Sequence, residues 1–225
     1  MLEMSWHGFA SYSGMAREHR IQESELHYHI IARCNNRAFH FETGEDFEIY
    51  LGLLRLFKKK HQFQLFNYEL MNSHVHLFLQ PSPQISLGKT MHAINWHFSN
   101  GYNKRKKRKG HFWMGRYKSI PVDTDEHALT LMRYINRNAV RAKMVPKPGD
   151  WKYSGYRFYA FGEPNDLLDP HPTYLGLAEN EETRRTYYQR FVCQVLPEDD
   201  VRESRWSESR YIGSPQFGQK LGLEK

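Results

Sequence analysis

Two apolar runs separated by the dipeptide Asn72-Ser73 constrain the fold of this chain most strongly. The runs, from Phe63 to Met71 and from His74 to Gln80, have the length of β-strands, and a short polar turn between such runs is typical of a β-hairpin. The second run begins with His74-Val75-His76. Because successive side chains of a strand point to opposite faces, the two histidines share one face and Val75 points to the other. The sequence therefore predicts a hairpin that presents two imidazoles together.

The segment before this hairpin shows a strand pattern followed by a helix pattern. Tyr28 to Cys34 is apolar and β-branched and ends at Asn35-Asn36, which predicts a strand. Thr43, with Asp46 three residues later, predicts the start of a helix that ends in Lys58-Lys59-Lys60. The apolar residues of this helix follow the 3.6-residue period: Phe47, Tyr50, Leu51, Leu54 and Phe57.

Two further helices are predicted after the hairpin. Ser86 is a typical N-cap residue for the first of them. Its apolar surface is expected to consist of Leu87, Met91, Ile94, Trp96, Phe98 and Tyr102. A short extended segment around residues 117–122 follows, and Asp123-Thr124 then opens the second helix. Its apolar residues are Ala128, Leu129, Leu131, Met132 and Ile135, and the helix is expected to run on toward Val140.

The order of these elements is strand, helix, strand, strand, helix and an added helix. This order predicts an α+β fold of the ferredoxin-like kind, in which helices cover one face of an antiparallel sheet. Residues 1–20 show no periodicity and are expected to be an unstructured or dispensable leader, whereas residues 21–146 form the domain itself. Pro146 and Pro148 interrupt the pattern, so residues 147–225 are predicted to be a smaller, mainly helical extension.

The composition fits a globular protein of the cytoplasm. The chain has 225 residues, of which 40% are hydrophobic, and this is enough for a core. No stretch approaches the roughly 20 apolar residues that span a bilayer, and residues 1–20 lack the apolar centre of a signal peptide. Cys34 and Cys193 lie far apart without a Cys-x-x-Cys pattern, which argues against a zinc ribbon or a disulfide scaffold. Both thiols are expected to be reduced and buried.

Positive charge is concentrated in one window of the chain. Lys and Arg number 32 against 25 Asp and Glu, and the window 101–120 contains eight basic residues and no acidic one. Residues 163–203 instead carry ten acidic residues, so a phosphate partner is expected at the basic window and not there. The alternatives for the run 104–109 are a solvated, mobile loop without specific contacts and, in a eukaryotic protein, a signal of the nuclear-import kind. The candidate DNA-binding residues are Lys104, Arg105, Lys106, Lys107, Arg108, Lys109, Arg116 and Lys118, and the candidates for stacking on bases are Tyr102, Phe112, Trp113 and Tyr117.

The histidine pair on the predicted hairpin is suited to binding a divalent metal, because a neutral imidazole nitrogen ligates such ions well. Two ordinary polar residues on a half-exposed strand would give the same pattern. His27 and His29 have the same spacing, and a neighbouring strand can bring His29 near the pair. The spacing alone does not decide among these interpretations.

Tyr134 and Asn138 supply a second candidate pair on the third predicted helix. They lie four residues apart, so both project from one face. A phenol is a weak nucleophile at its usual pKa, but a nearby divalent cation favours the phenolate and polarises a phosphate under attack. An amide oxygen is a hard ligand for Mg²⁺ or Mn²⁺. The structural alternatives are an aromatic residue at the rim of the core and an asparagine near the end of a helix.

Four blocks of sequence, in this order, resemble the REP-associated tyrosine transposases, an IS200-like branch of the single-tyrosine His-hydrophobic-His (HUH) nucleases. The blocks are residues 28–37, Met71 to Leu77, Gly110 to Lys118 and Tyr134 to Ala142, and the resemblance extends to Trp151-Lys152-Tyr153-Ser154-Gly155-Tyr156. The family commonly has proline in Met-Pro-Asn-His and Asn-Pro-Val-Arg-Ala, where this chain has Met71-Asn72-Ser73-His74 and Asn138-Ala139-Val140. These departures remove no catalytic group.

The resemblance implies a chemistry for the candidate residues. It assigns His74, His76 and Asn138 as ligands of Mg²⁺ or Mn²⁺ and Tyr134 as the nucleophile. The implied substrate is single-stranded DNA next to a palindromic hairpin, cleaved through a covalent 5′-phosphotyrosine in the cytoplasm of a bacterium. A homodimer is one possible assembly. The alternatives are a hairpin DNA- or RNA-binding module that keeps the fold without the chemistry, and a metal-dependent hydrolase that uses water.

Overall fold

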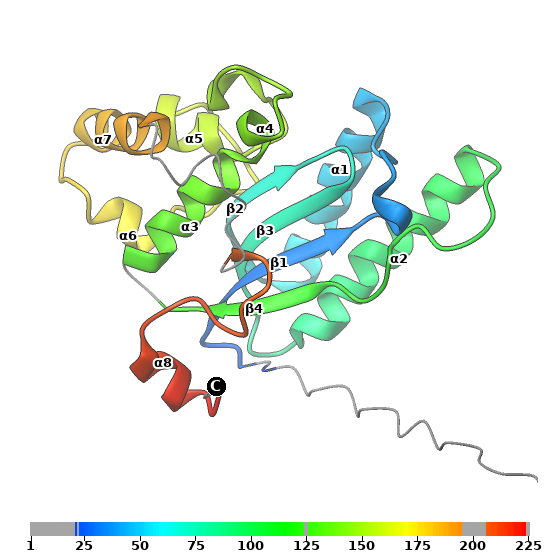
Figure 1. The fold of residues 1–225 in the computed structure, drawn as a ribbon, viewed down its shortest axis with the longest axis horizontal. Helices are drawn as coiled ribbons and strands as arrows, with labels where there is room; N and C mark the ends of the chain where they lie inside the picture. Colours follow the sequence, from blue (N-terminus) through cyan, green and yellow to red (C-terminus); the bar gives the residue numbers. More distant parts are fainter. Residues whose placement is uncertain (1–20, 22, 124–125, 195–205, 224–225) are drawn as a thin grey trace, which may run out of the picture.

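A four-stranded antiparallel sheet forms the centre of the protein (Figure 1). The computed structural model describes residues 21, 23–123, 126–194 and 206–223, so the predicted leader, residues 1–20, lies outside the described residues. The strand order is β2-β3-β1-β4, with β1 and β3 at the centre. The strands are β1 (His27–Arg33), β2 (Gln64–Leu70), β3 (His74–Gln80) and β4 (Lys118–Val122). The predicted hairpin is β2 with β3, and the predicted strand before it is β1.

Two long helices cover one face of the sheet. α1 (Gly44–His61) and α2 (Leu87–Arg105) lie behind the sheet in Figure 1. At the start of α1, the Thr43 N–H donates to the Asp46 carboxylate (3.2 Å), and at the start of α2, the Lys89 N–H donates to Ser86 Oγ (3.3 Å). Both predicted helix starts are therefore confirmed. Alternate strand residues complete this layer of the core: Tyr28, Ile30, Val75, Leu77 and Leu79 are fully buried.

The segment that the sequence indicated only as extended forms the fourth strand. β4 pairs antiparallel with β1, with Ile120 opposite His29. Pro121 has no N–H to donate, and an edge strand tolerates this because one side of the strand carries no partner strand. With β4 in place, the chain follows the order β1-α1-β2-β3-α2-β4, which confirms the predicted ferredoxin-like α+β fold.

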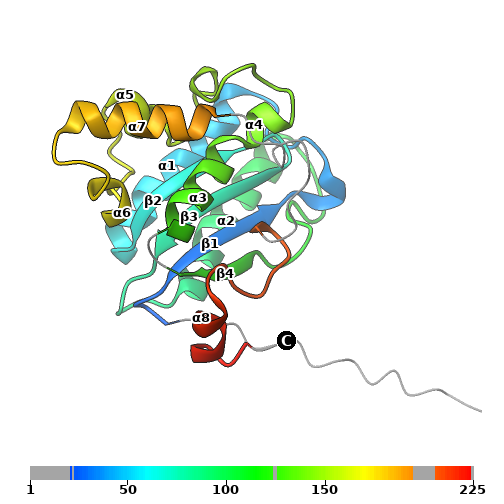
Figure 2. The same cartoon turned by 60° about the vertical axis from the view of Figure 1, so that its left-hand side comes forward.

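A third helix lies on the opposite face of the sheet. α3 (Glu126–Asn136) lies in front of β2 and β3 in Figure 2, and the Asn67 side chain of β2 donates to the Met132 carbonyl (3.3 Å). The helix does not run on toward Val140 as predicted. Its geometry is interrupted at Arg137, where ψ is −2°, and α4 (Asn138–Arg141) follows. The predicted start at Asp123-Thr124 falls partly outside the described residues.

Trp96 was predicted to belong to the apolar surface that α2 turns toward the core, and this was wrong. The buried apolar residues of α2 recur every three or four positions: Leu87, Met91, Ile94, Phe98 and Tyr102. Trp96 lies two residues from Ile94 and two from Phe98, which is about half a helical turn away. Its side chain is 52% exposed.

The segment after residue 146 contains short helices; its first part packs along the β2 edge of the sheet, whereas α8 (Pro215–Lys220) and the residues before it lie at the β4 edge (Figure 1). The Leu70 N–H donates to the Tyr153 carbonyl and the Gly155 N–H to the Tyr68 carbonyl, both at 2.9 Å. These bonds satisfy backbone groups that an open edge would expose. The helices of this segment are η2 (Pro148–Asp150), α5 (Tyr156–Phe161), α6 (Pro172–Leu175), α7 (Glu181–Cys193) and α8. A further short helix, η1 (Asn35–Arg37), lies between β1 and α1. The division at residue 146 stays a prediction.

The two cysteines differ in their surroundings. Cys34 is buried as predicted, and burial raises the pKa of its thiol to about 12. Cys193 was predicted to be buried and is instead exposed, because it is the last residue of α7, whose buried side chains are Tyr188 and Val192. Among the described residues, no helix is both long and apolar enough to cross a membrane.

Asp46 links the first turn of α1 to the end of α2, and its removal is expected to destabilise the fold. Its side chain is 1% exposed and pairs with Arg105 at 2.7 Å. Asp46→Ala removes both the capping carboxylate and this partner, so the free energy of unfolding is expected to fall by about 1–3 kcal/mol. Urea denaturation at pH 7 measures this change, and Glu45→Ala, an exposed acid of the same turn, serves as the control.

The effect of Asp46→Ala is also expected to depend on pH. Burial, which alone would raise the pKa of Asp46, is outweighed by hydrogen bonds from the Thr43 and Glu42 N–H groups and by Arg105, so the pKa lies below its usual value. The difference in free energy of unfolding between the wild type and Asp46→Ala is therefore fully present above pH about 4, and it is lost as the pH falls through the pKa of Asp46 in the folded state. A stability difference between wild type and variant that grows on acidification would contradict the lowered pKa of Asp46.

Candidate active site

The sheet face opposite α1 and α2 carries three histidines in contact. His29 Nε2 on β1 lies 2.8 Å from His76 Nδ1 on β3, and the two rings are stacked with centroids 5.1 Å apart. The His74 ring centroid is 4.8 Å from that of His76, and His74 Nδ1 lies 3.0 Å from Ser73 Oγ. Both β3 histidines therefore use Nδ1 for these contacts, which leaves Nε2 of each ring for a ligand.

Burial keeps these imidazoles neutral at pH 7. It lowers the pKa of His74 to about 4, with Arg33 adding to the effect. It lowers the pKa of His29 to about 3, although the Trp206 backbone opposes this. The pKa of His76 falls well below its usual value, through burial first and then through His74 and His29. Neutral imidazoles can ligate a cation without first losing a proton.

Tyr134 of α3 lies directly over the histidines. Its ring centroid is 5.8 Å from that of His76 and 6.0 Å from that of His29, in both cases edge to face. Trp206 stacks on the Tyr134 ring with centroids 5.5 Å apart, and the Arg141 guanidinium carbon lies 4.8 Å from the ring centroid. Aromatic and cation–π contacts thus hold the phenol beside the histidine pair.

Asn138 closes the end of α3 with its side chain. Its Nδ2 donates to the backbone carbonyls of Tyr134 (3.0 Å) and Ile135 (3.1 Å) at the end of the helix. The amide carbonyl oxygen therefore remains for a ligand. The structure thus brings together the four residues that the sequence pointed to, His74, His76, Tyr134 and Asn138, around one cavity.

The cavity has a volume of about 240 Å³ and a strongly basic lining. Among the residues that the structure describes, no Asp or Glu lines it, and three guanidinium groups do, from Arg33, Arg37 and Arg141. Arg37 adopts φ = 54°, a left-handed conformation that is unusual for a residue other than glycine, asparagine or aspartate. The remaining lining residues are Ser73, His74, His76, Tyr134, Asn138 and Ser207. Such a lining suits an anion of the size of a phosphate.

Helix α7 of the C-terminal segment anchors the tyrosine helix. Arg133 Nε donates to the Phe191 carbonyl (3.0 Å), and Arg137 Nη1 donates to the Val192 carbonyl (2.9 Å). These carbonyls belong to the last turn of α7, where cationic donors are favoured. Asn136 Nδ2 adds a bond to the Tyr188 hydroxyl (2.8 Å). The position of Tyr134 over the sheet therefore depends on residues far beyond the catalytic motifs.

Glu69 is a buried carboxyl beside the site that the sequence analysis missed. It lies on β2 opposite His76, is fully buried, and its Oε1 accepts the Ala139 N–H at 2.7 Å. Burial raises its pKa well above the usual value, opposed by the bond from Ala139. The signal in the sequence was an acidic residue inside an apolar strand. The carboxyl ties the first turn of α4, and with it Asn138, to the sheet.

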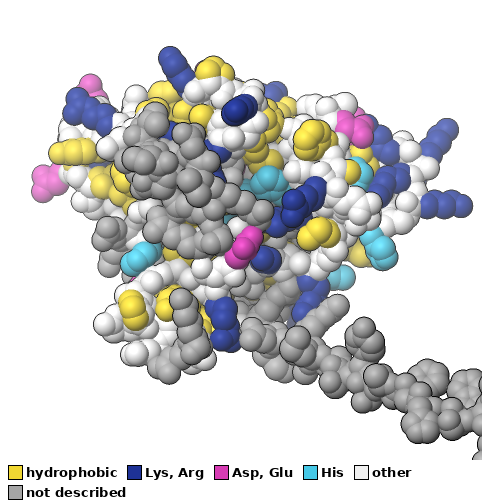
Figure 3. Space-filling model, viewed as in Figure 1, with side chains coloured by type: hydrophobic (Ala, Val, Ile, Leu, Met, Phe, Trp, Pro, Cys, Tyr) yellow, Lys and Arg dark blue, Asp and Glu magenta, His cyan; other side chains and the backbone are white. Residues whose placement is uncertain are grey.

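The predicted DNA-binding residues of the run 104–109 lie at the end of α2 and directly after it, where Lys and Arg gather at the right of Figure 3, whereas Arg116 lies beside the middle of α2 and Lys118 begins β4. Two of them have acidic partners: Arg105 pairs with Asp46 and Lys106 with Glu42, each at 2.7 Å. Others donate to neutral groups, Arg108 to the His111 carbonyl and Lys118 to the Ser207 carbonyl, both at 2.9 Å. The side chains of Lys104, Lys107, Lys109 and Arg116 are exposed.

Three of the four aromatic residues predicted to stack on bases are taken up by the core. Tyr102, Phe112 and Tyr117 are at most 7% exposed. For these three the prediction was wrong, because the spacing of aromatic residues in a basic window does not reveal which of them the core takes up. Trp113 is half-buried, and its indole N–H donates to the Asn95 carbonyl (3.0 Å), so for this residue the role stays a prediction.

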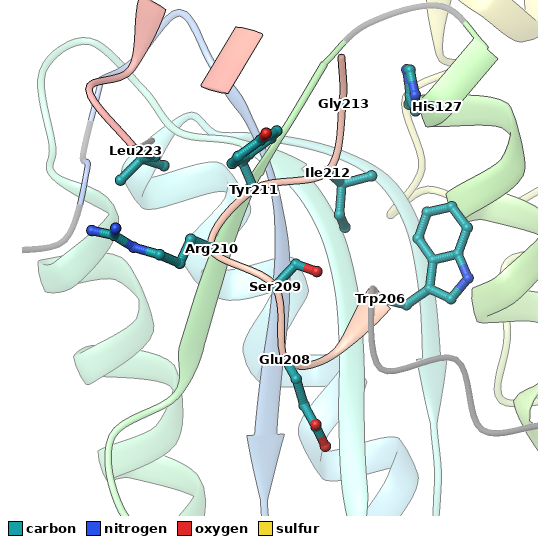
Figure 4. Close-up of a pocket in the computed structure, with 9 residues that line it drawn as sticks. All are labelled: His127, Trp206, Glu208, Ser209, Arg210, Tyr211, Ile212, Gly213 and Leu223. Carbon is teal, nitrogen blue, oxygen red and sulfur yellow. The ribbon is translucent and has the colours of Figure 1, made fainter. Parts of the chain in front are cut away.

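A segment close to the C-terminus covers part of the sheet on the histidine side (Figure 4). The Asp123 N–H donates to the Ile212 carbonyl (2.7 Å) and the Ile212 N–H to the Pro121 carbonyl (2.9 Å), which fastens the segment to the end of β4. A cavity of about 410 Å³ lies here, lined by His127, Trp206, Glu208, Ser209, Arg210, Tyr211, Ile212, Gly213 and Leu223. Trp206 contributes both to this cavity and to the stack on Tyr134.

The donor set around Tyr134 fits a divalent metal. Within the described ranges, no group of three or more His, Cys, Asp or Glu side chains is arranged to hold a metal. The Asn138 carbonyl oxygen is a third candidate ligand beside the two neutral imidazoles. The contact between His76 Nδ1 and His29 orients the His76 ring in the way that metal-binding histidines are oriented.

Comparisons with known proteins bear on the family and the fold of this chain. The family model described as "Transposase IS200 like" matches residues 22–138. The fold is similar to that of a REP-associated tyrosine transposase bound to a REP hairpin, with a TM-score of 0.58, 13% identity, and coverage of 71% of this chain and 93% of that one. A putative transposase from Deinococcus radiodurans gives a TM-score of 0.38 and 20% identity over 54% of this chain and 95% of its own. A search of curated protein sequences gives no match.

His29 is expected to control the affinity of the site for a divalent cation. His29→Ala removes the group that holds His76 Nδ1, so Mn²⁺ binding measured by isothermal titration calorimetry is expected to weaken about 10- to 100-fold. His29→Asn, which keeps a polar partner, should lose less, and His111→Ala, an exposed histidine outside the cavity, should bind as the wild type does. Unchanged Mn²⁺ affinity in a folded His29→Ala variant would contradict this role.

Proposed function

This chain belongs to the IS200-like transposase family, and from this premise we propose that it is a metal-dependent transposase that cleaves and rejoins single-stranded DNA through Tyr134. One observation carries the proposal. A phenol lies over two neutral imidazoles in a cavity whose described lining residues include three with guanidinium groups. Such a site attracts a phosphodiester and offers it a nucleophile.

The arginines of the cavity bind the substrate in this proposal. Guanidinium groups match phosphate oxygens in geometry and charge, and Arg33, Arg37 and Arg141 reach the cavity from β1, the turn after β1 and α4. Arg141 also lies against the Tyr134 ring, so its charge favours the anion that develops when the phenol loses its proton.

His74, His76 and Asn138 would hold the metal, for which Mg²⁺ and Mn²⁺ are the candidates. Two imidazoles and an amide oxygen form a mixed nitrogen and oxygen set that either ion can accept together with water. When bound, a divalent cation supplies neutralisation of charge on the phosphate oxygens. The protein contributes preorganisation: His29 orients His76, Ser73 orients His74, and the end of α3 orients Asn138.

Tyr134 carries the covalent step. Its Oη bonds to phosphorus while the bond from phosphorus to the DNA 3′ oxygen breaks; the phenol proton is released, and the 3′ oxygen takes up a proton. The products are a 5′-phosphotyrosine and a free 3′ hydroxyl. A phosphodiester bond replaces a phosphodiester bond, so attack by a 3′ hydroxyl on the phosphotyrosine rejoins strands without a further energy source.

A DNA hairpin is the proposed partner. The REP-associated transposase with the similar fold is bound to a REP hairpin, and the end of α2 and the following loop give this chain a basic surface next to the catalytic face. Lys104, Lys107, Lys109 and Arg116 are the side chains best exposed for phosphate contact. Arg105 and Lys106 would have to exchange Asp46 and Glu42 for phosphate, which their ion pairs at 2.7 Å oppose.

Covalent capture of a labelled hairpin oligonucleotide tests the proposal. Wild-type protein with Mn²⁺ or Mg²⁺ is expected to form an adduct that survives SDS, and Tyr134→Phe is expected to form none because only the nucleophilic oxygen is lost. Tyr187→Phe, an exposed tyrosine of α7, is the matched control and should keep the wild-type yield.

The same experiment separates the alternatives. Binding without cleavage under both metals would identify a non-catalytic hairpin-binding module, and cleavage without an adduct would identify a hydrolase that uses water. An adduct that persists in Tyr134→Phe would refute the assignment of the nucleophile. Asn138→Ala is expected to reduce the adduct rate by at least about tenfold while hairpin binding in the absence of metal is retained.

A further inference from the structure

A groove of about 440 Å³ lies on the far side of the sheet from the catalytic cavity, between α2 and residues 113–117. One wall is the outer side of α2, with His92 and Trp96. The other wall is formed by Trp113, Arg116 and Tyr117, and Met91 contributes from the buried side of α2. None of the roles derived above for the catalytic face uses this groove.

Trp96 is the feature of the groove that folding does not explain. More than half of its side chain is exposed, although a tryptophan offers a large apolar surface that folding would favour burying. α2 has enough buried residues without it, and the phase of the helix turns Trp96 outward. An exposed large apolar group next to a preformed groove is typical of a contact with a ligand.

The wall opposite Trp96 is held in place by several bonds. The Trp113 indole N–H donates to the Asn95 carbonyl on α2 (3.0 Å), and the Met114 N–H donates to the Arg33 carbonyl at the end of β1 (2.9 Å). Cys34 and Trp113 form a β-bridge. Because both α2 and β1 anchor this wall, the groove exists before any ligand binds, and binding costs little ordering entropy.

The charge around the groove selects an anionic ligand. No Asp or Glu occurs in the sequence between Glu69 and Asp123, a stretch that contains all of α2 and the loop after it. Arg116 lines the groove and is exposed. A flat indole face beside a guanidinium matches a nucleotide with an unpaired base, since a paired base has both of its faces covered by its neighbours in the stack.

One of the anchoring bonds also connects the wall of the groove with a residue of the catalytic cavity. The residue whose carbonyl accepts the Met114 N–H is Arg33, and the Arg33 side chain lines the catalytic cavity on the other side of the sheet. From this geometry, and resting on the function proposed above, we infer that the groove binds an unpaired nucleobase of the substrate strand. The base stacks on Trp96, and its phosphate pairs with Arg116.

The test combines protein variants with abasic sites. A hairpin oligonucleotide with a single-stranded tail is prepared as a series with one abasic site at each unpaired position, and its affinity is measured by fluorescence anisotropy without metal. Trp96→Ala is expected to weaken binding of the intact oligonucleotide about 5- to 150-fold, the equivalent of about 1–3 kcal/mol for one base–aromatic stack. Trp96→Phe should recover most of this loss, and Tyr187→Ala, an exposed aromatic residue of α7, should bind as the wild type does.

The abasic series identifies the contact. At one unpaired position the abasic site should weaken binding to the wild type and to Trp96→Phe but not to Trp96→Ala, because the stack is already lost there. Equal sensitivity of wild type and Trp96→Ala at every position would overturn the inference. Adduct formation through Tyr134 on the same oligonucleotide distinguishes the groove inference from the proposed function. If the adduct forms but Trp96→Ala leaves binding unchanged, only the inference about the groove is refuted. If no hairpin binds and none forms an adduct, both proposals are refuted.

Discussion

The register between β1 and β3 is the constraint on which the rest of the structure depends. It places Ile31 opposite His76 and His29 opposite Phe78, so that the histidines of both central strands meet on one face. A shift of one residue would turn the imidazoles into the apolar layer under α1 and α2 and would expose residues such as Ile30 and Leu77. The free-energy cost of burying the imidazoles in that layer and exposing these apolar residues fixes the register. The position of the reactive groups is therefore determined by side chains on the opposite face that have no chemistry of their own.

Much of the fold could be predicted from local patterns. The hairpin, the start of α1 at Thr43 and the start of α2 at Ser86 each depend on residues close together in the chain, and all three are confirmed. β4 was indicated only as an extended segment because five residues that include a proline show no clear alternation, and its strand character comes from pairing with β1. The exposure of Cys193 likewise depends on how α7 packs, which its own sequence does not specify.

Some residues of the candidate site could likewise be predicted from local sequence, and others could not. The spacing of His74 and His76 on a strand, and of Tyr134 and Asn138 near a helix end, was enough to single them out. Arg33, Arg37 and Arg141 were not singled out as cavity residues, because only the tertiary fold brings β1, its following turn and α4 together. For the aromatic residues, the position within the helical period predicts burial better than the number of aromatic residues in a window does. The helical period of α2 separates Trp96 from Phe98, whereas a count of aromatic residues treats them as equivalent.

Asn138 illustrates how a helix end can dictate the chemistry of a side chain. Its amide nitrogen faces two backbone carbonyl oxygens, those of Tyr134 and Ile135, so the atom at that position must carry hydrogens. An aspartate would set oxygen against oxygen there, although its negative charge would suit a cation better. An amide donates at one end and accepts at the other, and the helix end has already determined which end does which. A carboxylate is thereby disfavoured at position 138, so under the function proposed above this residue adds no negative charge to the side of the cavity that the phosphate approaches.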